Sequence, residues 1–275
     1  MNSVRHSEFR LSYVGSVLER LQTSVLRISI WRERSEDVYD LFECGPRRRF
    51  TVMTNAGPLI VHNCGYQVGG TKLQFTAWKD HKIKMTEEEA AWIVSSYRAD
   101  NPHVVESWWG LQDAACNAIR LNRPTSYKDI WYECVVDAAG RWLSCVLPNG
   151  KRIWYFDPAL IPYTDKYGRE RYEITYQGKD SKRGGAWGTI RTYGGMLFEN
   201  CIQAIAREVM ADAMLRVEAA GYPLILTVHD ELISEDDTTH GSDEEFSALV
   251  RVVPPWLKGC PIGAGGWSGT RYKKT

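Results

Sequence analysis

The sequence predicts an α+β fold, in which strands and helices occupy separate stretches of the chain. Strand patterns occupy residues 21–62 and, as hairpins, 131–156 and 223–235, where β-branched residues are bounded by turn residues such as Gly-Pro and Asn-Gly. Helical patterns occupy 86–122 and 194–220, where apolar residues recur every three or four positions.

The composition is that of a soluble globular protein. Of 275 residues, 44% are hydrophobic and 25% are charged, and 34 Lys and Arg balance 34 Asp and Glu. No apolar run of about 18 residues occurs, and the first residues lack the apolar core of a secretory signal. The seven cysteines are odd in number and form no CxxC pair. This pattern fits a reducing cytoplasm and argues against a disulfide framework or a zinc site.

The chain changes character near residue 63. The first 63 residues contain nine arginines and no lysine, whereas all 12 lysines follow, beginning at Lys72. The same stretch holds Trp31 as its one tryptophan, and the remaining residues hold ten. Such a shift is natural where two segments of different origin are joined.

The triplet His62-Asn63-Cys64 follows a short apolar strand pattern. An asparagine amide can attack its own backbone carbonyl and break the next peptide bond, and a neighbouring imidazole can protonate the leaving amine. A cysteine thiol just after the bond can accept an acyl group. Taken alone, the triplet also fits an ordinary turn.

The run DVYDLFECGPRRRFTVMTNAGPLIVHNC closely resembles the C-terminal end of inteins, over roughly residues 22–63. The resemblance implies that Asn63 cyclises, that His62 donates a proton and that Cys64 is the branch-point nucleophile. It implies no cofactor for splicing.

Two further positions bear on the intein resemblance. Asp40 matches the acidic residue of the VYDL block, whereas Arg48 stands where many inteins have histidine. No N-terminal splicing block is recognisable in residues 1–20. We therefore expect the C-terminal part of an intein, either a trans-splicing half or a fragment of a longer gene.

The run LILTVHDELISE places Asp230 and Glu231 at a turn after an apolar strand, beside His229. Phosphoryl transfer by two metal ions needs carboxylates that are held rigidly, and a strand-turn-strand can hold them. A solvated acidic turn would contain the same residues.

Residues 64–275 resemble the fingers and palm of phage-type family A DNA polymerases, the DNA polymerase I group. The matching runs, in order, are CGYQVGGTKLQF, LPNGKRIWYFDP, RTYGGMLFENCIQAIAREVMADAMLRVEAAGYP, TVHDE and PPWLKGCPIGAGGWSGTRYKK. The resemblance implies a small all-β intein segment over 1–63, followed by a helical fingers region and an antiparallel-sheet palm over 64–275. The last run matches the family's usual carboxyl terminus.

The polymerase resemblance assigns roles to particular residues. Asp230 is implied as a metal-binding aspartate, Glu231 as its support and His229 as a contact of the primer terminus. The cofactor implied is Mg²⁺, at a two-metal site completed by an aspartate that this chain does not contain.

The same resemblance implies DNA contacts elsewhere. Tyr66 stands where a fingers tyrosine packs beside the nascent base pair, Gln203 where the minor groove is contacted, and Arg191 where template or primer is contacted. Ordinary packing and helix polarity would also account for Tyr66 and Gln203.

Residues 141–191 carry ten Lys and Arg against five Asp and Glu, interleaved with aromatic residues. A basic, aromatic stretch suits backbone contacts with nucleic acid, and a solvated β-surface is the alternative. The aromatic residues include Trp142, Trp154, Tyr155, Tyr163, Tyr167, Tyr172, Tyr176 and Trp187.

The two resemblances together imply template-directed addition of dNTPs to a primer after protein splicing at Asn63 and Cys64. The implied partners are primer-template DNA, dNTP and an N-terminal polymerase and intein half, with no membrane partner. The implied location is the cytoplasm of a bacterial or phage-infected cell. An alternative is a self-cleaving intein half that carries an inert, duplex-binding polymerase fragment.

Overall fold

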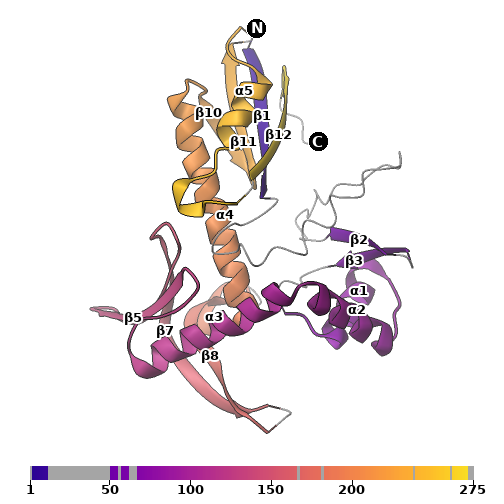
Figure 1. Cartoon of the computed structure of the whole chain (residues 1–275), viewed down its shortest axis with the longest axis vertical. Coiled ribbons are helices and arrows are strands. Elements are labelled where there is room, and N and C mark those ends of the chain that lie inside the picture. The colour runs from indigo at the N-terminus through magenta and orange to yellow at the C-terminus, as the bar shows by residue number, and fades with distance from the viewer. Residues whose placement is uncertain are drawn as a thin grey trace. The chain divides into compact units, whose positions relative to one another are not determined.

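The computed structural model describes residues 2–11, 50–54, 57–61, 67–165, 168–180, 183–237, 239–260 and 262–271 (Figure 1). Within these ranges the fold is α+β, with helices and antiparallel sheets, as the sequence predicts. None of the described helices has the length and hydropathy needed to cross a bilayer.

The described elements comprise five α-helices and three antiparallel sheets. The helices are α1 (Gly70–His81), α2 (Glu87–Asp100), α3 (Pro102–Leu121), α4 (Gly194–Ala219) and α5 (Asp243–Val250). A four-stranded sheet has the order β10 (Leu224–Val228), β11 (Glu231–Asp237), β1 (Asn2–Leu11) and β12 (Ile262–Gly269). A two-stranded sheet pairs β2 (Phe50–Thr54) with β3 (Gly57–Val61). A six-stranded sheet runs in chain order through β4 (Thr125–Tyr127), β5 (Ile130–Asp137), β6 (Gly140–Val146), β7 (Arg152–Thr164), β8 (Glu170–Asp180) and β9 (Ala186–Thr192).

The chain divides into two compact units, which are described separately. One contains Met1–Leu26, Leu147–Lys151 and Cys201–Thr275, and the other contains Arg27–Val146 and Arg152–Asn200. In the first unit, β1 lies between β11 and β12 and pairs with both. The boundary predicted between residues 63 and 64 falls outside the described residues and stays a prediction.

Helix α2 begins where its sequence predicts. The Thr86 hydroxyl accepts a hydrogen bond from the Glu89 amide at 3.1 Å, and the Glu89 carboxylate accepts one from the Thr86 amide at 2.7 Å. This capping box satisfies two amides that have no partner inside the helix. Asn101 ends α2, and Pro102 begins α3 at a position where its missing amide hydrogen is not needed.

Helix α3 packs on one face of the six-stranded sheet, chiefly on β4 and β5 (Figure 1). Its buried side chains include Trp108, Leu111 and Ala115. The strands contribute Tyr132, Leu143 and Tyr155 to this core, and each is at most 3% exposed. The burial of this apolar surface is the main favourable term that holds helix and sheet together.

The hairpin pattern predicted over 131–156 is present, but one turn is shifted. The sequence pattern predicts a turn at the Ala-Gly pair Ala139-Gly140, whereas Ala138 and Ala139 form the turn and Gly140 is already paired with Asp137. The Asp137 carboxylate accepts hydrogen bonds from the amides of Ala139 at 2.8 Å and Gly140 at 3.1 Å. This local side-chain bond stabilises the turn one residue earlier than the glycine suggests.

Candidate functional site

The tip of the β10–β11 hairpin consists of His229 and Asp230, because Val228 pairs directly with Glu231. His229 has a φ of 53°, in the left-handed region that is costly for a residue with a Cβ atom. Both tip residues are exposed. The hairpin therefore presents an imidazole and a carboxylate side by side at the end of two hydrogen-bonded strands.

Glu231 occupies a different environment from its neighbour in the chain. It is only 5% exposed, and the next three residues of β11 are buried as well. The hydroxyl of Ser234 donates a hydrogen bond to the Pro223 carbonyl at 2.7 Å, which ties β11 to the start of β10. One carboxylate thus faces solvent and the other is enclosed by the protein.

A magnesium site is only partly supplied by these residues. In the part of the chain that the structure describes, no three His, Cys, Asp or Glu side chains gather to hold a metal ion. Mg²⁺ prefers oxygen ligands and is often held by one or two carboxylates together with water and substrate phosphates. Asp230 fits one ligand of such a site, and a second protein carboxylate would have to come from another segment.

Helix α4 leads toward the hairpin and is anchored near its C-terminal end. Its buried residues recur every four positions, which gives one apolar stripe along the helix: Cys201, Ile205, Val209, Ala213 and Val217. Gln203 lies between these positions and is exposed. The exposure of Gln203 is compatible with a contact to DNA, which stays a prediction.

Three side chains of α4 fix the surrounding segments. The Glu218 carboxylate accepts a hydrogen bond from the Leu224 amide at 2.7 Å, at the first residue of β10. Arg216 donates to the carbonyls of Leu249 and Val252, each at 3.1 Å. Asp212 accepts a hydrogen bond from the Trp256 indole at 2.8 Å. These contacts hold the base of the hairpin and the C-terminal segment against the same helix.

Arg191 lies in the other compact unit, on strand β9. Its guanidinium is 3.4 Å from the Glu173 carboxylate on β8, and its side chain is 72% exposed. A pair this exposed is screened by water and contributes little to stability. Arg191 is thus accessible to a phosphate, but a role shared with Gln203 or Asp230 stays a prediction.

Four of the predicted site residues, His62, Asn63, Cys64 and Tyr66, lie outside the described residues. The structure describes the preceding hairpin, in which Phe50 pairs with Val61. Strand β3 therefore ends one residue before His62. The chemistry proposed for the junction rests on the sequence.

No protein-family model matches the sequence. Over 214 residues, or 76% of this chain, the sequence is 31% identical to a DNA polymerase of Bacillus phage SP02. The chain resembles a phage DNA polymerase over most of its length. It spans 31% of that polymerase. Residues 1–63 are too few to account for the match, so most of it falls in 64–275.

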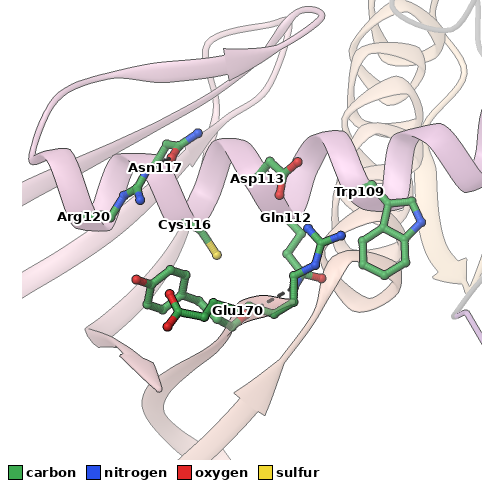
Figure 2. Close-up of a pocket in the computed structure, with 9 residues that line it drawn as sticks. Trp109, Gln112, Asp113, Cys116, Asn117, Arg120 and Glu170 are labelled. Carbon is green, nitrogen blue, oxygen red and sulfur yellow. Dashed lines mark hydrogen bonds between the residues drawn. The ribbon is translucent and has the colours of Figure 1, made fainter. Parts of the chain in front are cut away.

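A cavity lies between α3 and the start of β8, and the sequence did not indicate it. The cavity measures about 160 Å³ and carries charges of both signs, from Asp113, Arg120, Glu170 and Arg171. Figure 2 shows Gln112 and Cys116 on the side of α3 that faces the strand carrying Glu170.

Gln112 connects α3 to β8 and to the start of α4 through its side-chain amide. Its amide nitrogen donates to the Tyr172 carbonyl at 3.3 Å, and its amide oxygen accepts from the Gly194 amide at 2.9 Å. A glutamine on the apolar stripe of a helix, one position after Leu111, is the signal that could have pointed to such a buried connection.

Cys116 should react slowly with alkylating reagents. Burial and the nearby Asp113 carboxylate raise the pKa of the Cys116 thiol to about 11. Because the thiolate is the reactive form, alkylation by iodoacetamide should rise about tenfold per pH unit up to that pKa. Peptide mass spectrometry after timed alkylation measures this rate, and Asp113→Asn should increase it. Rapid alkylation at pH 8 would contradict the raised pKa.

Proposed function

We propose that residues 64–275 form the fingers and palm region of a family A DNA polymerase, which adds deoxynucleotides to a primer 3′ end as the template directs. The observation that carries this proposal is the relation to a phage DNA polymerase over most of the chain. The hairpin supports it, because phosphoryl transfer needs carboxylates in fixed positions and Asp230 is exposed at a short turn.

Each residue of the hairpin tip and its neighbour has a separate role in this proposal. Asp230 would hold Mg²⁺, the buried Glu231 would support the turn from inside β11, and His229 would contact the primer terminus. When bound, Mg²⁺ would supply positive charge that stabilises the attacking and leaving oxygens. The protein's own contribution is position, because the paired strands hold the imidazole and the carboxylate at one end of the hairpin.

We also propose an N-terminal polymerase half as partner, which supplies the second metal-binding aspartate and the residues that hold the dNTP. Two facts support this part of the proposal. Asp230 is not accompanied by two further potential ligands within the described ranges. The chain also spans only 31% of the related polymerase. Primer-template DNA, dNTP and Mg²⁺ would then be bound by both halves together.

Residues 1–63 would act earlier, in protein splicing. The Cys64 thiol would accept the acyl group of the N-terminal half by thioester exchange, in which the thiol of the partner half that first carried this acyl group leaves. The Asn63 amide nitrogen would then attack its own backbone carbonyl. His62 would protonate the departing amine of Cys64, so that the bond between residues 63 and 64 breaks and a succinimide forms. The freed amine of Cys64 would take the acyl group from its own sulfur and complete a peptide bond.

Without a partner, the chain should cleave itself at this junction. Incubation of the purified chain should release a product that begins at Cys64, and Asn63→Ala should release none because alanine has no amide nucleophile. Intact-mass spectrometry identifies the bond that breaks. Asn55→Ala removes an asparagine from the connection between β2 and β3 and should cleave like the parent chain. Release of the same product by Asn63→Ala would exclude the splicing proposal.

A second candidate function is a self-cleaving chain whose polymerase part binds duplex DNA without catalysis. The excess of Lys and Arg in 141–191 favours it, because phosphate contacts alone can produce DNA binding. Under this candidate, mixing with the N-terminal half would restore no DNA synthesis, while the chain alone would bind duplex DNA in a salt-dependent way.

A further inference from the structure

The face of the six-stranded sheet opposite α3 carries a row of aromatic residues. Successive side chains of a strand point to opposite faces, so the neighbours of the buried Leu143 and Tyr155 point away from α3. Across the strands, Trp142 opposes Phe156 and Phe156 opposes Gln177. The register therefore places residues of β6, β7 and β8 on the same outward face.

The rings on this face contact one another. Trp142 meets Phe156 with centroids 4.7 Å apart and meets Trp154 edge-on at 6.2 Å. Phe156 also meets Trp187 of β9 at 6.3 Å. We call Trp142, Trp154, Phe156 and Trp187 the aromatic face. Their mutual contacts hold the rings in place before any ligand arrives, which reduces the entropy lost on binding.

The aromatic face is open to solvent at two of its tryptophans. Trp154 is 46% exposed and Trp187 is 63% exposed. Trp131 of β5 lies on the same side of the sheet and is 50% exposed. Exposed apolar residues scattered singly are ordinary, whereas a contiguous exposed aromatic patch marks a surface that binds something.

Positive charges lie beside these rings, together with the Asp137 carboxylate, which accepts a hydrogen bond from the Trp142 indole at 3.1 Å. The Arg152 guanidinium lies 5.6 Å from the centre of the Trp154 ring and donates a hydrogen bond to Ser144 at 2.7 Å. Arg152 also pairs with the Glu133 carboxylate. Lys179 is exposed and directly opposite Trp187 in the strand register. Rings with neighbouring cations match the two chemical features of a nucleic-acid strand, flat bases and a phosphate backbone.

We propose that the aromatic face binds single-stranded DNA, with bases stacked on Trp154 and Trp187 and phosphates close to Arg152 and Lys179. Only an unpaired strand offers base faces to an exposed ring, because the base faces of a duplex are already stacked on one another. If the proposed polymerase function holds, this strand is the unpaired template. That assignment rests on the proposed function, whereas the binding site itself does not.

Fluorescence anisotropy measures the affinity for a fluorescein-labelled oligo(dT) of about 20 nucleotides. This length exceeds the number of nucleotides that a stacking platform usually covers. Trp187→Ala and Trp154→Ala should each weaken binding about 10-fold, as expected for the loss of one stacked base. Trp187→Phe keeps a ring and should recover most of the affinity. The matched control is Trp92→Ala on α2, since Trp92 is 62% exposed against 63% for Trp187.

Several results would overturn this site. Unchanged affinity in both alanine variants would show that the aromatic face does not bind single-stranded DNA and would favour a protein partner. An equal loss in Trp92→Ala would show that oligo(dT) binds exposed tryptophans without preference for this face. A larger loss of duplex or oligo(U) binding than of oligo(dT) binding in Trp154→Ala and Trp187→Ala would exclude single-stranded DNA as the ligand of this face. Trp187→Ala is scored by oligo(dT) binding and Asp230→Asn by primer extension, so failure of this inference and failure of the polymerase proposal are distinguishable.

Discussion

Replacing Gly194 with alanine should lower the free energy of unfolding by about 3 kcal/mol or more, at the upper end for overpacking of a protein interior. A Cβ atom at Gly194 would lie 2.0 Å from the Trp108 carbonyl oxygen and 2.6 Å from its carbon. Both are backbone atoms of α3, so no side-chain rotation can relieve the overlap. Moving the start of α4 away would also stretch the hydrogen bond from the Gly194 amide to Gln112, which is 2.9 Å long.

Urea unfolding of the parent chain and of the variant measures this loss. Gly188→Ala is the matched control, because a Cβ atom there would meet nothing within 4 Å. Its effect should stay within about 0.5 kcal/mol, as for ordinary surface substitutions. Equal stability of Gly194→Ala and the parent would show that α3 and α4 do not approach each other as closely as the structure indicates.

Asp230→Asn should reduce primer extension by about 100-fold or more in a mixture of the chain with its N-terminal half, the scale seen when a catalytic charge contact is removed. Asparagine keeps the size of aspartate and is well accepted in turns, so the hairpin should form unchanged. The substitution removes the negative charge that would hold Mg²⁺. The chain by itself should extend no primer, with or without the substitution.

Incorporation of a labelled dNTP opposite a defined template measures this activity. Glu235→Gln is a suitable control because Glu235 is an exposed carboxylate on the same hairpin, away from its tip. Full activity of Asp230→Asn would remove Asp230 from the metal site. No activity in any mixture, together with salt-dependent duplex binding by the chain, would favour the non-catalytic candidate.

Local elements are the part of the fold that the sequence predicted well. Thr86 with Glu89, and Asn101 with Pro102, mark the two ends of α2, because capping depends on residues only a few positions apart. The four-residue apolar period between Cys201 and Val217 likewise predicted α4, which ends just before Gly221 with a φ of 89°. Both signals are local, so neither needs the rest of the chain.

The sequence predicted which residues form the candidate site, but not how far each of them is buried. The sequence placed Asp230 and Glu231 together at a turn after an apolar strand, whereas the structure places His229 and Asp230 at the turn and Glu231 already in β11. The sequence did not show that Asp230 is exposed while Glu231 is 5% exposed. Burial of one neighbour and not the other depends on strand pairing and on what packs against β11, and both are long-range properties.

The sequence by itself determined the positions of α2, α3 and α4 and of the β5–β6 and β10–β11 hairpins. It also singled out the residues that could perform chemistry, because helix caps, hydrophobic periods and motif spacing act over a few residues. Only the tertiary structure decided that β8 and β9 extend the sheet beyond β7 and that Trp142, Phe156 and Trp187 share one face. Strand register sets which side chains meet, and register depends on partners that are distant in sequence. The aromatic and basic composition of 141–191 was visible from the start, and its arrangement as one exposed surface came from the pairing of strands.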